Sequence, residues 1–311
     1  MSLRRFLRPV GAVLALAVAA LAIRVLVRAW HQAATQPVQW EFTLGWLVAA
    51  TGTAIATYLT LVESWRRTLH GYGQPTSFRS ALRVWILSNF GKYFGSFGIV
   101  AGMALLAQNE GINAPVAVTA AVIMQALSLA TGVALSGILA ADALRNLGPL
   151  YSWGAVAIGV LAIAGSGILH SQRALDRIRS LLPSGVPPIR AAGLQSLLIG
   201  LVGNTLAWLG YGLVMVLLAR GLFASPPPHL ADATSAYTVS YLVGLLALFV
   251  PAGLGLRETI FTALLAPAAG LKVAAALAIA SRILLTLVEI GIALPFVARR
   301  RKHPSPSDTG R

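Results

Sequence analysis

The octapeptide PAGLGLRE at positions 251–258 places an arginine and a glutamate directly after a helix-breaking sequence. Gly253 and Gly255 allow positive φ angles and close backbone approach, while the proline removes a hydrogen-bond donor. A helix that begins after this break would present free N–H groups and its positive dipole end, which favour an anion. Arg257 adds a planar fork of donors for phosphate or carboxylate, and Glu258 can orient that fork or bind a cationic group. The sequence therefore predicts an anion site at this break.

Two further charges, Arg282 and Glu289, follow in the last apolar segment and are spaced to share one helical face. A charge in the middle of a bilayer costs about 2.5–3.5 kcal/mol on the insertion scale. We therefore expect Arg257 or Glu258 to lie within reach of Glu289 or Arg282. The four charges form either structural salt bridges or a substrate site. We favour the substrate site, because apolar packing would fasten the segments without burying charge.

A second glycine-rich stretch, at 84–107, contains Lys92 as its only cation. Two interpretations of Lys92 stay open. Its side chain either extends to the cytosolic surface or contacts a phosphate from the cytosolic side, with Asn89 and Tyr93 as hydrogen-bonding partners.

The remaining polar residues give weaker signals. Gln125, Gln195, Asn204 and Tyr211 lie inside apolar segments, where interhelical hydrogen bonds are the expected role. The chain has no cysteine, and its five histidines fall in predicted loops or in the tail without metal-ligand spacing. No phosphate-binding loop or nucleophile elbow is present. We expect no metal, no cofactor and no enzyme activity.

The elements that carry these residues are predicted to be membrane helices, because 57% of the chain is hydrophobic and only 11% is charged. Two apolar stretches, 84–107 and 236–266, are interrupted by glycines. Six others are long enough to span a bilayer: 10–27, 42–62, 115–141, 150–169, 191–219 and 271–297. The predicted fold is an all-α polytopic membrane protein with up to eight hydrophobic segments, the first an uncleaved helix.

The net charge of +15 does not indicate a nucleic-acid partner, because the basic residues gather in loops and at the chain ends, as in membrane proteins. Loops 63–83 and 170–190 are arginine-rich, which predicts that both are cytosolic, together with both termini. All of these segments can lie on the cytosolic side only if 84–107 and 236–266 do not cross the membrane. We therefore predict that each is a re-entrant hairpin and that the two enter from opposite faces. The basic segment 299–311 is predicted to be a flexible cytosolic tail beside anionic lipid.

A weak internal repeat agrees with this topology. The sequence AlaLeuLeuAla occurs at 104–107 and 263–266, followed at the same spacing by Gly111 and Gly270. The repeat-like units are 84–141 and 236–297, in opposite orientations within one membrane domain, 1–298. Inverted repeats whose broken helices meet near the bilayer midplane are typical of transporters.

The octapeptide at 251–258, with Arg282 downstream, resembles the C-terminal signature of the lysylphosphatidylglycerol synthase transmembrane region, or flippase-like, family. Gly91-Lys92-Tyr93 resembles the start of that family's first motif, and the likeness extends over essentially the whole chain. The motif's usual proline is replaced near Gly95-Ser96, and Met103 stands where many members have arginine. The family's synthase domain is absent, so aminoacyl transfer is not expected.

The resemblance implies a lipid translocase of the inner (cytoplasmic) membrane. Its substrate would be an anionic or zwitterionic phospholipid, a glycolipid or a polyprenyl-linked lipid. Movement would be downhill or coupled to an ion gradient through Glu258 or Glu289. Two alternatives are a non-transporting partner of a separate lipid synthase or glycosyltransferase, and a small-solute transporter. The oligomeric state is not determined by the sequence.

Overall fold

The computed structural model describes residues 38–94, 98–139, 149–169, 171–173, 176–177, 193–246, 253 and 255–298. The predicted first span, 10–27, and the basic tail, 299–311, lie outside these residues. Within these residues every element of regular secondary structure is a helix, and the only β-type pairing there is an isolated bridge between Trp40 and Phe223. This confirms the predicted all-helical fold.

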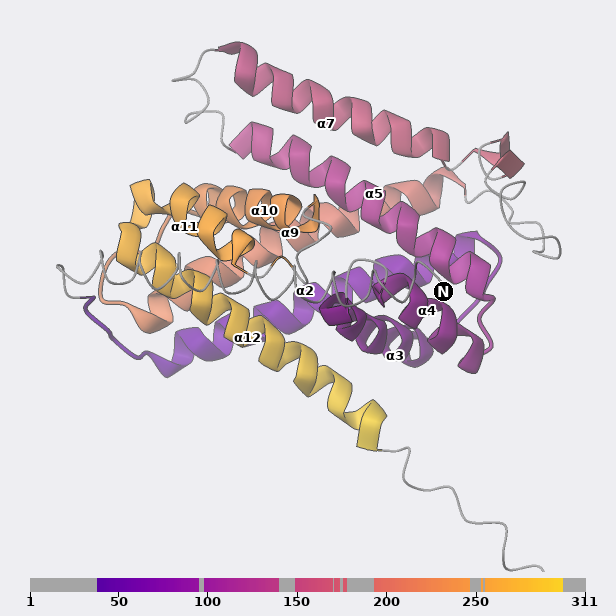
Figure 1. Cartoon of the computed structure of the whole chain (residues 1–311), viewed down its shortest axis with the longest axis horizontal. Coiled ribbons are helices and arrows are strands. Elements are labelled where there is room, and N and C mark those ends of the chain that lie inside the picture. Colours follow the sequence, from indigo (N-terminus) through magenta and orange to yellow (C-terminus); the bar gives the residue numbers. More distant parts are fainter. Residues whose placement is uncertain are drawn as a thin grey trace, which may run out of the picture.

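Five long helices correspond to predicted spans (Figure 1). They are α2 (Leu44–Gly71), α5 (Ala114–Leu139), α7 (Pro149–Leu169), α9 (Leu194–Leu222) and α12 (Leu271–Ala298). By length and composition, α2, α5, α9 and α12 can each cross a membrane. The polytopic membrane class predicted from hydropathy is therefore confirmed.

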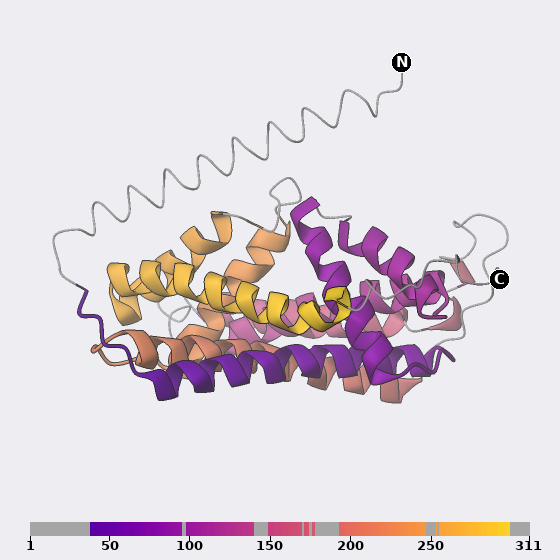
Figure 2. The ribbon, with the colours of Figure 1, turned by 90° about the horizontal axis from the view of Figure 1, so that it is seen from below.

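Helices α2 and α9 form an antiparallel pair that runs along the length of the molecule (Figure 2). The Glu41 N–H donates to the Leu222 carbonyl at 2.9 Å, which ties the start of α2 to the end of α9. Further along, Gly203 and Gly210 of α9 lie directly against Ser64 and Thr57 of α2. Small residues at this spacing let two helix backbones approach closely, the usual way that membrane helices pack.

The first glycine-broken stretch forms a hairpin, α3 (Phe78–Asn89), the 3-10 turn η2 (Phe90–Phe94) and α4 (Gly98–Asn109). The chain enters and leaves this hairpin at the same end, where the Gln74 amide oxygen accepts a hydrogen bond from the Asn113 N–H at 3.3 Å. Arg83 and Glu110, at the open end of the hairpin, form an ion pair at 2.5 Å. The chain therefore enters and returns on one side before α5 begins.

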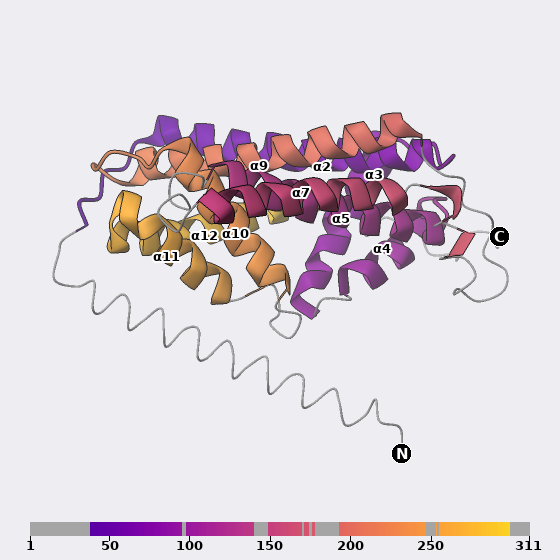
Figure 3. The same ribbon diagram turned by 90° about the horizontal axis from the view of Figure 1, so that it is seen from above.

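The second stretch forms a hairpin of α10 (Leu230–Leu246) and α11 (Leu256–Ala269). The two hairpins lie toward opposite ends of the long helices, and their described arms converge near the middle (Figures 2 and 3). Gly111 and Gly270 end the two hairpins with similar φ angles, 71° and 79°. The two glycines occupy the positions that the predicted internal repeat aligns.

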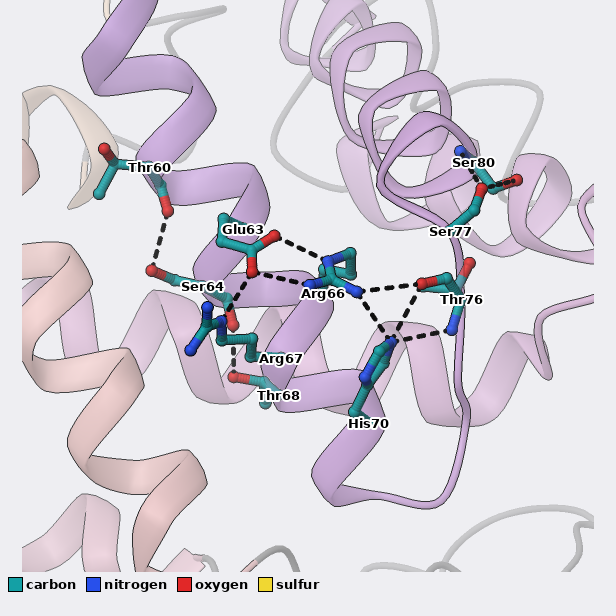
Figure 4. Close-up of polar contacts among 10 residues, drawn as sticks. All are labelled: Thr60, Glu63, Ser64, Arg66, Arg67, Thr68, His70, Thr76, Ser77 and Ser80. Carbon is teal, nitrogen blue, oxygen red and sulfur yellow. Dashed lines mark hydrogen bonds and ion pairs between the residues drawn. The ribbon is translucent and has the colours of Figure 1, made fainter.

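The polar end of α2 extends further than the predicted span 42–62. Arg66 and Arg67 lie on the last turns of α2 rather than in a loop, and both bind Glu63 (Figure 4). His70, predicted to lie in a loop, is also helical, and its Nε2 accepts from the Thr76 N–H at 3.0 Å. The helix continues because these ion pairs join residues three and four apart, where helical side chains meet.

Candidate functional site

One cavity of about 250 Å³ is lined by residues of both hairpins and of α2, α5, α9 and α12. Seven of the nine predicted site residues line it, and they come from three separate parts of the chain. They are Asn89, Lys92, Gly253, Arg257, Glu258, Arg282 and Glu289. The structure therefore brings together most of the polar residues that the sequence singled out.

Glu289 is the acceptor at one side of the cavity and is only 4% exposed. The Lys92 ammonium lies 2.6 Å from each of its carboxylate oxygens, and the Tyr58 hydroxyl donates to Oε1 at 2.5 Å. These contacts join the first hairpin, α2 and α12. Glu289 is therefore paired with the first hairpin and not with Arg257, which is one of the partners that the sequence allows. These contacts also turn the Lys92 ammonium toward α12 instead of a membrane surface.

Glu258 closes the break in the second hairpin. Its Oε2 accepts from the Gly255 N–H at 2.6 Å, and its Oε1 lies 3.3 Å from Arg282 Nη1. The predicted pairing between Arg257 or Glu258 and the last helix is therefore present, through Glu258 and Arg282. Gly255 does not line the cavity, and its N–H, predicted to bind an anion, already donates to the Glu258 carboxylate.

Arg257 has a different environment. Its guanidinium carbon lies 4.6 Å from the ring centroid of Tyr237 and 5.0 Å from that of Tyr241, both on α10. Among the described residues no carboxylate lies within ion-pair distance of Arg257. A guanidinium that is fixed by stacking and partly exposed to a cavity retains donors for an anion.

Glycines fix the position of this arginine. Gly253 has a φ of 64°, and a Cβ there would lie 3.0 Å from the Gly244 Cα. Gly91 and Gly98 make the equivalent close backbone contact in the first hairpin. A side chain would therefore clash at Gly91 and Gly98 and would be tightly crowded at Gly253, so both hairpins close on glycine pairs. The side chain of Tyr93, the remaining predicted site residue, lies outside the described residues.

The sequence interpretation missed the aromatic wall of the cavity, which is formed by Tyr58, Tyr211, Tyr237 and Tyr241. Two of these are spaced four apart on α10, just before the break, and this spacing is the signal that could have identified them. Tyr211 stacks on Tyr237 with ring centroids 4.9 Å apart. Its expected role as an interhelical contact is thus combined with a place in the cavity wall.

Gln125 and Asn204, both predicted to make interhelical hydrogen bonds, behave differently. The Asn204 amide donates to the Gly200 carbonyl in its own helix at 2.8 Å. Gln125 lines the cavity, and its buried Nε2 has no hydrogen-bond partner in the described structure. Met103, at the position where the resembling family often has arginine, also lines the cavity.

Comparison with curated proteins finds no match to this chain. Comparison with protein families finds one that spans nearly the whole chain, covering residues 12–292. The match includes both hairpins, all the long helices up to the last turns of α12, and every residue of the cavity. The chain therefore belongs to the family described as the lysylphosphatidylglycerol synthase TM region.

Proposed function

We propose that the protein translocates a lipid between the two leaflets of the membrane. The polar headgroup passes through the cavity while the acyl chains remain in the bilayer. The observation that carries this proposal is the convergence of charged residues from both hairpins and α12 on one cavity, whose lining residues lie near the middle of the long helices. Placing charged side chains at this depth costs free energy, so such residues indicate a site for a polar substrate.

The two ion pairs suggest how the headgroup moves. Lys92–Glu289 joins α12 to the first hairpin, and Arg282–Glu258 joins α12 to the second. A phosphate that displaces a carboxylate from Lys92 or Arg282 loosens one hairpin at a time. Movement of one repeat against the other around a fixed site is the general mechanism of transporters with this architecture.

The proposed orientation places the Gly71 end of α2 in the cytosol, because Arg66, Arg67 and Arg79 cluster there. The first hairpin then opens from the cytosolic side and the second from the outer side. Both termini would be cytosolic, in the inner membrane, with the basic tail against anionic lipid.

The proposal is tested with purified protein in liposomes that contain acyl-labelled fluorescent phospholipid. An impermeant quencher added outside removes only the outer-leaflet signal, so further loss reports translocation. We expect rapid loss with the native protein and slow loss with Arg257→Ala. Arg220→Ala is the matched control, since Arg220 also stacks on an aromatic ring, Trp46 at 5.0 Å, but does not line the cavity. A rate no higher than that of empty liposomes would contradict the proposal.

One observation favours a non-transporting alternative. Four of the five charged residues in the cavity pair with one another, as in a static salt-bridge cluster. Such a cluster would serve a protein that docks a separate lipid synthase or glycosyltransferase. The same liposomes distinguish the two functions, because a static partner moves no lipid with any headgroup.

A further inference from the structure

We infer that the cavity selects a lipid whose headgroup carries one net negative charge and free hydroxyl groups, and that it rejects amine-bearing headgroups. This inference rests on the proposed translocation and names the class of its substrate. The family description refers to a lysylated lipid, whose headgroup carries two ammonium groups and one phosphate. The structure points to a different substrate for this chain.

The first argument is the charge of the cavity. Its cations are Lys92, Arg257 and Arg282, and its carboxylates are Glu258 and Glu289, which leaves one net positive charge. The segments at the hairpin tips, 95–97 and 247–254, contain no charged residue in the sequence. A phosphodiester carries one negative charge, so its entry neutralises the cavity. A lysylated headgroup would instead add a second positive charge at low dielectric.

The second argument concerns the two carboxylates, which are the natural partners of an ammonium group. Glu258 accepts from the Gly255 N–H and Arg282, while Glu289 accepts from Lys92 and Tyr58. An ammonium could bind either carboxylate only by displacing a cation that the protein already supplies. With both ion pairs in place, as they are in the structure, neither carboxylate is a vacant amine site.

The third argument concerns the aromatic rings, the other common partners of ammonium groups. Arg257 occupies the faces of Tyr237 and Tyr241. Tyr211 stacks on Tyr237, and Tyr58 meets Tyr211 edge-on at 85° with its hydroxyl bound to Glu289. Among the described residues, these tyrosines therefore contact one another and the protein's own arginine, and Arg257 already takes the place that a substrate cation would occupy on Tyr237 and Tyr241.

Neutral hydrogen-bonding groups remain for the rest of the headgroup. The buried Gln125 amide has an unused N–H donor, and Asn89 lines the same cavity. The Ser240 and Ser281 hydroxyls donate to carbonyls in their own helices, which leaves their oxygens as acceptors. An amide donor and hydroxyl acceptors match the hydroxyls of a glycerol or a sugar.

The experiment compares acyl-labelled lipids in liposomes at equal protein density. Phosphatidylglycerol and phosphatidylinositol carry one negative charge with glycerol or ring hydroxyls, and phosphatidylmethanol carries the same charge without hydroxyls. Phosphatidylethanolamine and lysylphosphatidylglycerol bring amines. We expect the two hydroxylated lipids to cross at least about tenfold faster than the amine-bearing lipids, a difference of about 1.4 kcal/mol. Their relative rates show whether a glycerol or a ring headgroup is preferred.

Three results would separate the claims. Equal or faster crossing of lysylphosphatidylglycerol overturns the charge argument but keeps the proposed translocation. Equal rates for phosphatidylglycerol and phosphatidylmethanol overturn the hydroxyl argument. If no lipid crosses, the translocation proposal fails, and thermal stabilisation of the detergent-solubilised chain by each lipid tests headgroup selection by itself. There, stabilisation by lysylphosphatidylglycerol equal to that by phosphatidylglycerol would overturn the inference.

One variant tests whether Gln125 is responsible for this headgroup selectivity. Gln125→Leu keeps the size of the side chain and removes its donor. We expect it to slow phosphatidylglycerol to the rate of phosphatidylmethanol and to leave phosphatidylmethanol unchanged. A uniform loss for both lipids would indicate a packing role for Gln125 and would remove it from headgroup recognition.

Discussion

Lys92 and Glu289 are separated by 197 positions in the chain, yet the lysine ammonium lies 2.6 Å from both oxygens of the glutamate. This pair links the tip of the first hairpin to the last long helix. Both groups are largely removed from solvent, so neither charge is screened effectively by water or salt.

Removing one member of this pair should leave an uncompensated buried charge. We expect Glu289→Gln or Lys92→Met to destabilise the protein by about 3–5 kcal/mol, and the double variant to destabilise it by less than the two changes added together. Unfolding in mild detergent measures the effect. The parallel cycle with Glu289→Gln and Arg282→Met should give a smaller coupling energy, since Arg282 binds Glu258. Equal coupling in both cycles would show that the cavity charges act as one network.

Arg257 should require its planar guanidinium as well as its charge. Arg257→Lys keeps the positive charge but loses both the ring stacking and the bidentate fork, so we expect at least about a tenfold fall in lipid translocation. Translocation in liposomes provides the measurement. Arg220→Lys, which changes the same chemistry away from the cavity, should retain the native rate. A native rate in Arg257→Lys would assign the residue a generic charge role.

The close glycine contact in the second hairpin can be separated from backbone strain. Gly253→Ala places a methyl group 3.0 Å from the Gly244 Cα at a φ of 64°, whereas Gly270→Ala has a φ of 79° with no atom within 4 Å. Both variants should lose about 1–3 kcal/mol, because each forces a side chain into a positive-φ conformation that favours glycine. Gly253→Ala should lose more, measured as a lower unfolding midpoint. Equal losses would mean that the hairpin arms can separate without cost.

The orientation can be tested because the chain has no cysteine. We expect Leu175→Cys, in the arginine-rich loop after α7, to resist an impermeant thiol reagent added to intact cells. Ser225→Cys, in the exposed connection between α9 and α10, should react readily. Labelling after permeabilisation controls for access at both sites. Reaction of Leu175→Cys in intact cells would overturn the hairpin topology.

The positions of the hairpins and of the intramembrane charges could be predicted because both leave strong local signals. Glycine clusters break apolar runs, and charged residues are rare in such runs. Identifying partners needed more than the sequence. Arg282 and Glu289 share a face of α12 by their spacing, but each binds a different hairpin. Such choices depend on which tips meet in three dimensions.

The boundary of α2 was missed for a related reason. Hydropathy ends the segment at the first charges, whereas the helix continues to Gly71 because Glu63 neutralises Arg66 and Arg67 locally. The aromatic setting of Arg257 was also missed, because tyrosines in an apolar segment resemble ordinary core residues until the hairpin folds back over them.

The glycine pairs that close the hairpins have a mechanical consequence. Where backbone touches backbone, at Gly91–Gly98 and Gly244–Gly253, the two arms cannot slide or bend independently. We expect the two arms of each hairpin to move together as one rigid unit. We expect any bending to occur at Gly111 and Gly270, which have positive φ angles and open space where a side chain would lie. Movement of either hairpin would then pivot about its glycine, at the end of the hairpin that lies away from the cavity.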